Sequence, residues 1–231
     1  MKAGEVIVYV EGPSDKSAME SLLECLIQRK QREGVVIKFL EAPRGDKKVS
    51  VLTKVPRIAV DIIRGRAYSI VVAMPDLYPK NKGGFNHETV DELKAGILKN
   101  FNDALQCKDA RNDVRLKDRF KVFCFKYDLE ALILASEEAL KSRLGTDHLG
   151  VTWRIPVEDQ DHDHPPKRIV EDLFKEHGKR YKGTVDAPFI LRASDCQDIA
   201  EKCPQCFLPF VEFLTDIQPM SYHDEHDQPK E

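Results

Sequence analysis

The sequence predicts an α/β fold in which helices flank a mostly parallel sheet, followed by a mainly helical C-terminal extension. Residues 6–10 form an apolar, β-branched run that stops at Glu11 and the Gly-Pro pair after it. Residues 68–74 form a second such run, and Asp76 is the first charged residue beyond it. Short continuous apolar runs are typical of strands buried on both faces, as in parallel sheets. Helical periodicity between the runs completes the strand–helix alternation of an α/β protein.

The segments around these runs justify the remaining elements. Ser14 is expected to cap a helix, because its hydroxyl can accept a free amide hydrogen of the first turn. Gly34 is expected just after that helix ends, and Pro56 near the start of the next. In order, we expect a strand at 6–10, a helix from Ser14, a strand at 35–40, a basic turn-rich loop at 42–48, a helix from Pro56, a strand at 68–74, a helix at 88–105 and a strand at 120–125 leading directly into a helix.

Three regions are expected along the chain. Residues 1–135 should form the α/β core, and residues 136–219 a helical extension packed on that core over the strand ends. The extension is predicted from a helix that runs through Phe174 and a helical finish over 199–217. Residues 220–231 are polar and are expected to form a disordered tail.

Composition narrows the class of protein. The 231 residues are 42% hydrophobic and 32% charged, which favours a soluble protein with a packed core. No apolar stretch reaches the roughly 20 residues that span a bilayer, and no signal-peptide pattern precedes the first strand, so we expect no membrane association and a cytoplasmic location. The net charge of −3 provides no overall basic field, so any nucleic acid must be bound by local patches.

Two carboxylates are expected at one edge of the sheet. Glu11 and Asp76 each follow a buried strand, and the carboxyl ends of parallel strands form the ligand crevice of open α/β sheets. Oxygen ligands suit a hard divalent cation, so the pair predicts a site for Mg²⁺ (or Mn²⁺). Either residue alone is more typical of a turn or a helix cap, and the prediction depends on the pair.

Two basic segments are candidates for binding a substrate phosphate. Lys80 and Lys82 lie in a glycine-rich loop just after Asp76, which is either a solvated connection or a mobile phosphate-binding loop. Lys167 and Arg168 open a predicted helix, where cations are unfavourable, which points to a role other than helix stabilisation. The alternative for this pair is a solvated first turn.

The Val-Glu-Gly stretch ending at Gly12, with Asp76 after a later strand, resembles the TOPRIM domain of topoisomerases, primases and OLD-type nucleases. The resemblance implies that Glu11 is a general acid/base or metal ligand and that Asp76 is a metal ligand. Tyr78 stands where that family has a second Asp. Glu130 or Asp128, at the next strand end, is expected to supply the missing oxygen ligand.

Four stretches in the same order resemble the bacterial TOPRIM-like family DUF4276. They are Val10–Asp15, Asp76–Tyr78, Asp128–Ala135, and Pro165–Arg168 with the downstream Tyr181–Lys182 pair. The resemblance spans about residues 5–217. It implies partnership with an ATPase of the ABC/SMC type in anti-phage defence modules.

The expected function is Mg²⁺-dependent hydrolysis of a phosphodiester in DNA or RNA. Glu11 and Lys167 are the expected catalytic residues, with Glu11, Asp76 and Glu130 as metal ligands. Lys80, Lys82 and Arg168 are expected to bind the substrate phosphate. The alternative is a non-catalytic subunit that serves as a binding or assembly module for an ATPase partner, and a homo-oligomer is compatible with either.

Two further motifs receive structural interpretations. Cys203 and Cys206 have the spacing of a zinc or redox pair, but only Cys196 lies nearby as a further ligand. We interpret the pair as the start of a helix whose phenylalanines pack on the core. Trp153 and the scattered aromatic residues do not predict a platform for stacking bases.

Overall fold

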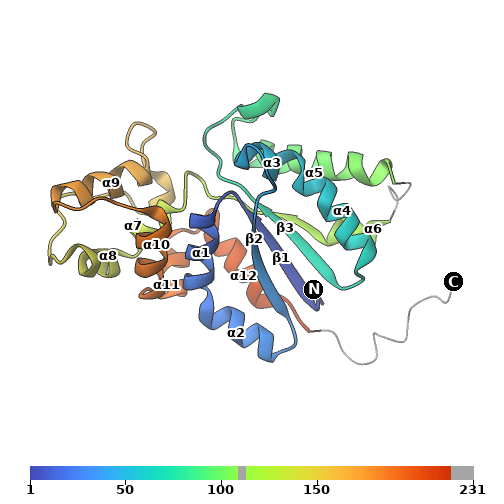
Figure 1. Ribbon diagram of the computed structural model, residues 1–231, viewed down its shortest axis with the longest axis horizontal. Coiled ribbons are helices and arrows are strands. Elements are labelled where there is room, and N and C mark those ends of the chain that lie inside the picture. The colour runs from blue at the N-terminus through green and yellow to red at the C-terminus, as the bar shows by residue number, and fades with distance from the viewer. Residues whose placement is uncertain (109–112, 220–231) are drawn as a thin grey trace.

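A four-stranded parallel sheet forms the centre of the protein (Figure 1). The computed structural model describes residues 1–108 and 113–219. Its strand order is β2-β1-β3-β4. The strands are β1 (Glu5–Val10), β2 (Val36–Glu41), β3 (Ser69–Met74) and β4 (Phe120–Val122). The predicted fold class, a parallel sheet flanked by helices, is confirmed.

Burial of the strands agrees with their positions in the sheet. Every residue of β3 is buried, as are all residues of β1 after Glu5. Both strands are central, so each has a helical layer on either face. In the edge strand β2, buried Ile37 and Phe39 alternate with exposed residues.

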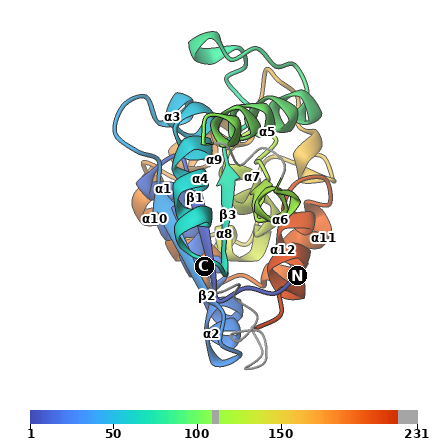
Figure 2. The same ribbon diagram turned by 90° about the vertical axis from the view of Figure 1, so that its right-hand side faces the viewer.

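One face of the sheet is covered by helices from the first half of the chain (Figure 2). Ile7 and Tyr9 of β1 point to this layer, together with Val71 and Ala73 of β3. The helices on this side are α3 (Lys47–Thr53), α4 (Val55–Gly65), α5 (Val90–Gln106) and α6 (Val114–Asp118).

The opposite face is covered by the first helices and the C-terminal ones together. Val6, Val8 and Val10 of β1 share one buried cluster with Phe207 and Phe210 near the end of the chain. The helices of this layer are α1 (Pro13–Leu22), α2 (Glu24–Arg32), α7 (Glu130–Ala135), α8 (Glu137–Leu144), α9 (Pro166–Glu176), α10 (Gly183–Arg192), α11 (Cys196–Lys202) and α12 (Phe207–Asp216). The C-terminal extension therefore shares a core with the sheet.

Local structure departs from the sequence prediction in two places near the strand ends. The first helix begins at Pro13, with Gly12 as its N-cap, so Ser14 does not cap it. Pro13 occupies the first helical turn, where its fixed φ suits the helix and its missing N–H costs no hydrogen bond. The predicted basic loop at 42–48 ends in helix α3, which is capped by the Asp46 side chain accepting from Val49 N at 3.1 Å.

The two ends of the described chain lie side by side, because Ala3 N donates to Gln218 O at 3.0 Å. The predicted disordered tail at 220–231 lies outside the described residues. Within the described ranges, no helix has the length and apolar character needed to cross a membrane.

Candidate functional site

Glu11 and Asp76 are in direct contact at the carboxyl edge of the sheet. The backbone N–H of Asp76 donates to Glu11 Oε1 at 3.0 Å. Asp76 also forms a parallel bridge with Phe125, which extends the pairing of β3 with the chain after β4. The ends of β1, β3 and β4 thus meet at one point, as the two buried runs predict.

Asp15 joins this pair from the first turn of α1. Its Oδ2 accepts the backbone N–H of Gly12 at 2.8 Å, which holds the carboxylate back toward the sheet edge. Asp15 was not among the residues predicted from the sequence. The available signal was its spacing, four residues after Glu11 in the helix that directly follows the strand.

Asp128, in the segment that links β4 to α7, and Glu130, the first residue of α7, complete the acidic cluster. The side chain of Glu130 is buried, with only 5% of the residue exposed. Oδ1 of Asp128 is buried and has no hydrogen-bond partner. The hydroxyl of Tyr181 is the other such side-chain atom among the described residues, and its charged neighbours are Glu130, Asp128 and Asp186. Unsatisfied buried polar atoms are rare, so their gathering at one place indicates a functional site. We call Glu11, Asp15, Asp76, Asp128 and Glu130 the acidic cluster.

The protonation equilibria of this cluster are strongly perturbed. Burial, followed by repulsion from neighbouring carboxylates, raises the pKa of Glu11 to about 7 and that of Asp15 to about 6. The same causes raise the pKa of Asp128 to about 8 and that of Asp76 well above its usual range. Carboxylates that repel one another in a partly buried site are complementary to a cation.

Lys48 is a buried cation beside the cluster that the sequence analysis placed in a loop. It is 1% exposed, and its Nζ donates to the carbonyls of Asp76 at 2.8 Å and Leu77 at 2.9 Å. Burial lowers the pKa of Lys48, while the negative charges of Glu11 and Asp76 oppose that effect. The ammonium group therefore fixes the backbone at the end of β3 and offsets part of the negative charge.

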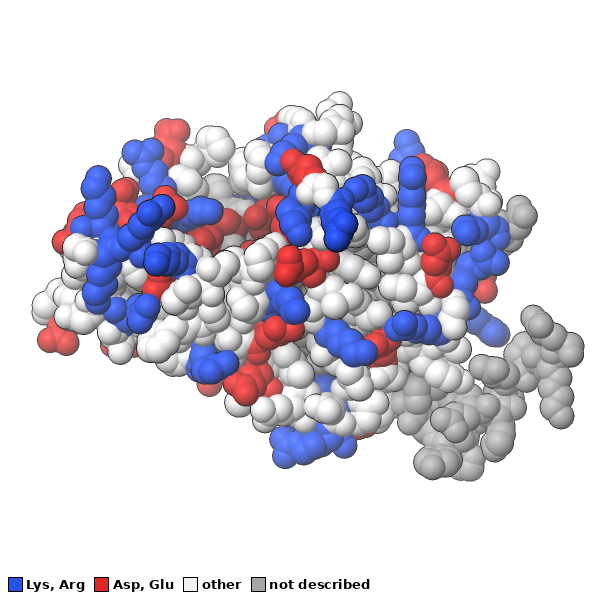
Figure 3. Space-filling model, in the orientation of Figure 1, with Lys and Arg blue, Asp and Glu red and all other residues white. Residues whose placement is uncertain are grey.

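Among the predicted basic residues, Lys167 is the one whose charge acts on Asp15 and Asp128. It is exposed in the first turn of α9, and its charge lowers the pKa of both Asp15 and Asp128. Figure 3 shows acidic side chains in a hollow between the sheet and the helices of the C-terminal layer, with basic side chains on both sides. Arg168 lies beside Lys167, and its Nε is 3.9 Å from Asp172 Oδ2 on the same helix.

The two lysines after Asp76 are engaged with surface carboxylates. Lys82 Nζ lies 2.8 Å from Asp46 Oδ2, and Lys80 Nζ lies 3.3 Å from Glu88 Oε2. Lys82 still contributes to the site, because its charge lowers the pKa of Glu11. The role of both lysines in phosphate binding stays a prediction.

The acidic cluster offers the oxygen ligands that suit a hard cation. Carboxylate oxygens are the ligands that Mg²⁺ takes, and the unpartnered Asp128 Oδ1 leaves one buried acceptor free for such an ion. Among residues 1–108 and 113–219, however, no three His, Cys, Asp or Glu side chains converge closely enough to enclose an ion. Glu11, Asp76 and Glu130, with Asp15 and Asp128 beside them, are the residues that would hold it after side-chain rotation.

The cysteine pair has the structural role that its position predicted. Cys203 and Cys206 are buried between α11 and α12, and α12 begins at Phe207. Cys206 Sγ lies 3.8 Å from Cys124 Sγ, both within the apolar interior. These thiols are therefore part of the core.

Comparison with known proteins identifies the family. A family model described as "Domain of unknown function (DUF4276)" matches residues 10–215. Among solved structures, the C-terminal region of the Burkholderia pseudomallei OLD protein is similar, with a TM-score of 0.45 and 14% sequence identity, covering 94% of this chain and 98% of that one. A likeness of that degree is distant, and no activity follows from it. None of the curated proteins matches the sequence. Because the family model covers most of the chain, including the acidic cluster, the protein belongs to the DUF4276 family.

Proposed function

We propose that the protein is a Mg²⁺-dependent (or Mn²⁺-dependent) phosphodiesterase or nuclease of TOPRIM type, acting on DNA or RNA in the cytoplasm. One observation carries the proposal: five carboxylates lie near the ends of three strands, each close enough to repel at least one of the others, and Oδ1 of one of them, Asp128, is buried without a hydrogen-bond partner. Carboxylates brought together against their own repulsion are typical of metal-assisted hydrolysis.

Each group in the site has a distinct task under this proposal. Glu11 and Asp76 would hold the cation, with Glu130 as a further ligand. The bound cation would polarise the phosphodiester and lower the pKa of an attacking water. Lys167, at the exposed rim, would stabilise negative charge that develops on the phosphate. Lys48 keeps the end of β3 in place through its two carbonyl contacts.

The substitution Glu11→Gln tests the proposal. Gln preserves the size of the side chain and can still accept the Asp76 N–H, but it removes the negative charge. We expect loss of Mg²⁺-dependent cleavage of labelled DNA and RNA, with the melting temperature within a few degrees of wild type. Glu5→Gln, at the opposite end of the same strand, is the matched control and should retain cleavage. Equal cleavage by wild type and Glu11→Gln would refute the proposal.

A second candidate function is a non-catalytic assembly module for an ATPase partner of the ABC/SMC type. Two observations favour it: Tyr78 occupies the position of the second Asp, and no three ligands converge among the described residues. Under this alternative, Glu11→Gln should retain both co-purification with the ATPase and protection of cells against phage. Loss of protection with intact co-purification would favour the enzyme.

A further inference from the structure

Two tyrosine rings stack near the acidic cluster, and a histidine ring lies tilted against the outer one; we call the three rings the aromatic stack. The ring of Tyr78, after β3, lies 5.0 Å from that of Tyr127, after β4, at an interplanar angle of 9°. The ring of His162, in the loop before α9, lies 5.0 Å from Tyr78 at 36°. Tyr127 is 8% exposed, Tyr78 is partly buried and His162 is exposed. The stack therefore runs from the interior to the surface, and its outer end is open.

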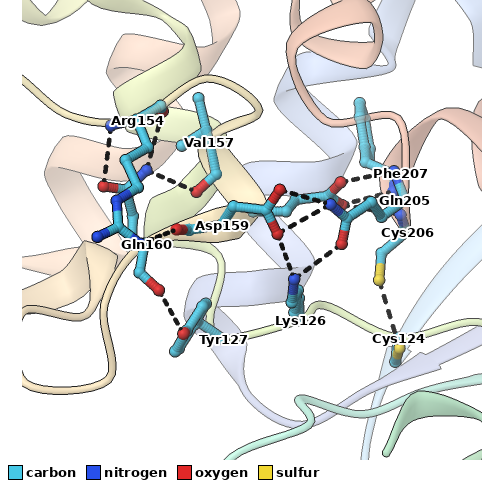
Figure 4. Close-up of polar contacts among 11 residues, drawn as sticks. Cys124, Lys126, Tyr127, Arg154, Val157, Asp159, Gln160, Gln205, Cys206 and Phe207 are labelled. Carbon is cyan, nitrogen blue, oxygen red and sulfur yellow. Dashed lines mark hydrogen bonds and ion pairs between the residues drawn. The ribbon is translucent and has the colours of Figure 1, made fainter.

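A hydrogen-bond network holds the loop that carries His162 (Figure 4). The Tyr127 hydroxyl donates to Gln160 O at 2.6 Å, which ties the innermost ring to this loop. The Gln160 side chain in turn holds the backbone of Arg154, accepting its N–H at 3.2 Å and donating to its carbonyl at 2.9 Å.

The loop is also fixed to the strand ends and to α12. Lys126 Nζ contacts both Asp159 and Gln205, and Gln205 Nε2 donates to both oxygens of Asp159 at 2.9 Å. Glu158 is buried and accepts the backbone N–H of Gln205 and Cys206. His162 therefore rests on Tyr78 at the end of a fixed loop.

Two of the three rings adjoin residues of the proposed catalytic site in the chain. Tyr78 is two residues from Asp76, and Tyr127 is next to Asp128 in the chain. Lys80 Nζ lies 5.2 Å from the centre of the Tyr78 ring. Aromatic faces with a cation beside them, adjoining a site for phosphodiester chemistry, have the composition of a surface that binds a single strand.

We propose that the exposed ring of His162, supported from behind by Tyr78, forms a stacking platform for an unpaired nucleobase next to the acidic cluster. The substrate is therefore single-stranded, or has a base turned out of its helix, at the position of cleavage. A paired base inside a duplex has both faces covered by its neighbours and cannot stack on the protein. This inference rests on the proposed function for its substrate class. Tyr78, at the position where a second carboxylate is missing, supports the His162 ring.

The test measures how much of the binding depends on the base. Binding is compared for three labelled probes of equal length. They are a single-stranded oligonucleotide with a central 2-aminopurine, the same strand with an abasic site at that position, and a fully paired duplex. Ca²⁺ replaces Mg²⁺, and anisotropy and 2-aminopurine quenching are recorded. We expect wild type to quench 2-aminopurine and to bind the intact strand more tightly than the other two probes. Loss of base–aromatic stacking predicts that His162→Ala weakens binding of the intact strand by roughly 5- to 150-fold. Its affinity for the abasic strand should equal that of wild type.

Controls separate this inference from the proposed function. His162 is exposed, so His162→Ala should keep the wild-type melting temperature, and His148→Ala, another exposed histidine, should bind as wild type does. Equal weakening for intact and abasic strands, or none for either, would overturn the platform. A wild type that cleaves with Mg²⁺ but binds both strands equally overturns this inference alone. Base-dependent binding without cleavage supports the platform and counts against the proposed function.

Discussion

Asp128 shows how strongly burial, together with the charge of a neighbouring carboxylate, disfavours an ionised carboxylate in the acidic cluster. Oδ1 of its carboxylate is buried and has no hydrogen-bond partner, and the charge of Glu130 adds to the effect of burial. Its pKa is therefore raised from 3.8 to about 8. The substitution Asp128→Asn keeps the shape of the side chain and removes its ability to ionise. We expect the variant to be more stable than wild type at high pH in the absence of a divalent cation.

The magnitude follows from proton linkage. Between pH 5 and pH 8 the carboxyl group is ionised in the unfolded chain and mostly protonated in the folded one, so the folded state binds the extra proton. Stability then falls as pH rises, by about 1.4 kcal/mol per pH unit, or about 4 kcal/mol over this range. The Asp128→Asn variant does not lose stability in this way as the pH rises, because Asn does not ionise. Because neighbouring carboxylates share the protons, we expect the difference in unfolding free energy between variant and wild type to shift by about 2 to 4 kcal/mol in favour of the variant.

Urea denaturation in EDTA at pH 5 and pH 9 measures this shift. The exposed Asp147→Asn is the matched control, and its effect on the unfolding free energy should be the same at both pH values. An Asp128→Asn variant with the same stability relative to wild type at pH 5 and pH 9 would refute the reasoning, because Asp128 would then ionise as freely in the folded protein as in the unfolded chain.

Three further predictions concern Lys48, the packing of α5 and binding of the divalent cation. Lys48→Met should lower the unfolding free energy by about 2 to 4 kcal/mol in urea titrations, because it leaves two buried carbonyls and two carboxylates without their cation; unchanged stability would contradict this role. Gly96→Ala places a Cβ 2.5 Å from Phe85 Cζ and should cost about 1 to 3 kcal/mol, whereas Gly65→Ala, with nothing within 4 Å, should cost little. Mg²⁺ should raise the melting temperature more at pH 8.5 than at pH 5.5, because protons compete for carboxylates with pKa values of about 6 to 8. An equal rise at both pH values would place the ion elsewhere.

The strand ends could be predicted because their signal is local. Continuous apolar runs identify β1 and β3, and the first charged side chain after each run, Glu11 or Asp76, must lie at the sheet edge. Glu130 and Asp128 lie a few residues beyond the predicted strand at 120–125, and Glu130 was expected as a ligand because Tyr78 stands where the TOPRIM resemblance has a second Asp. Parallel strands bring their carboxyl ends together whatever the intervening sequence, so this part of the site depends on topology alone.

Lys48 and the aromatic stack could not be predicted because they depend on distant contacts. In the sequence, Lys48 lies in a basic run typical of a surface loop. Its burial depends on the packing of α3 against the chain after β3, where Lys48 Nζ donates to Leu77 O. Tyr78, Tyr127 and His162 lie in three separate segments, and only the packing of the C-terminal layer brings His162 onto Tyr78. The beginning of α1 at Pro13 was missed because Ser14 competed with Gly12 as a cap.

Binding of a divalent cation by the acidic cluster is the central claim, and calorimetry tests it most directly. Mg²⁺ and Mn²⁺ are titrated into wild type and into the Glu11→Gln/Asp76→Asn double variant at pH 8, after circular dichroism has shown that both are folded. The account predicts saturable binding in the micromolar to low-millimolar range for wild type, of the order typical for a few carboxylate ligands, and its loss in the double variant. Equal heats of binding for the two proteins, or no binding by wild type, would contradict the account.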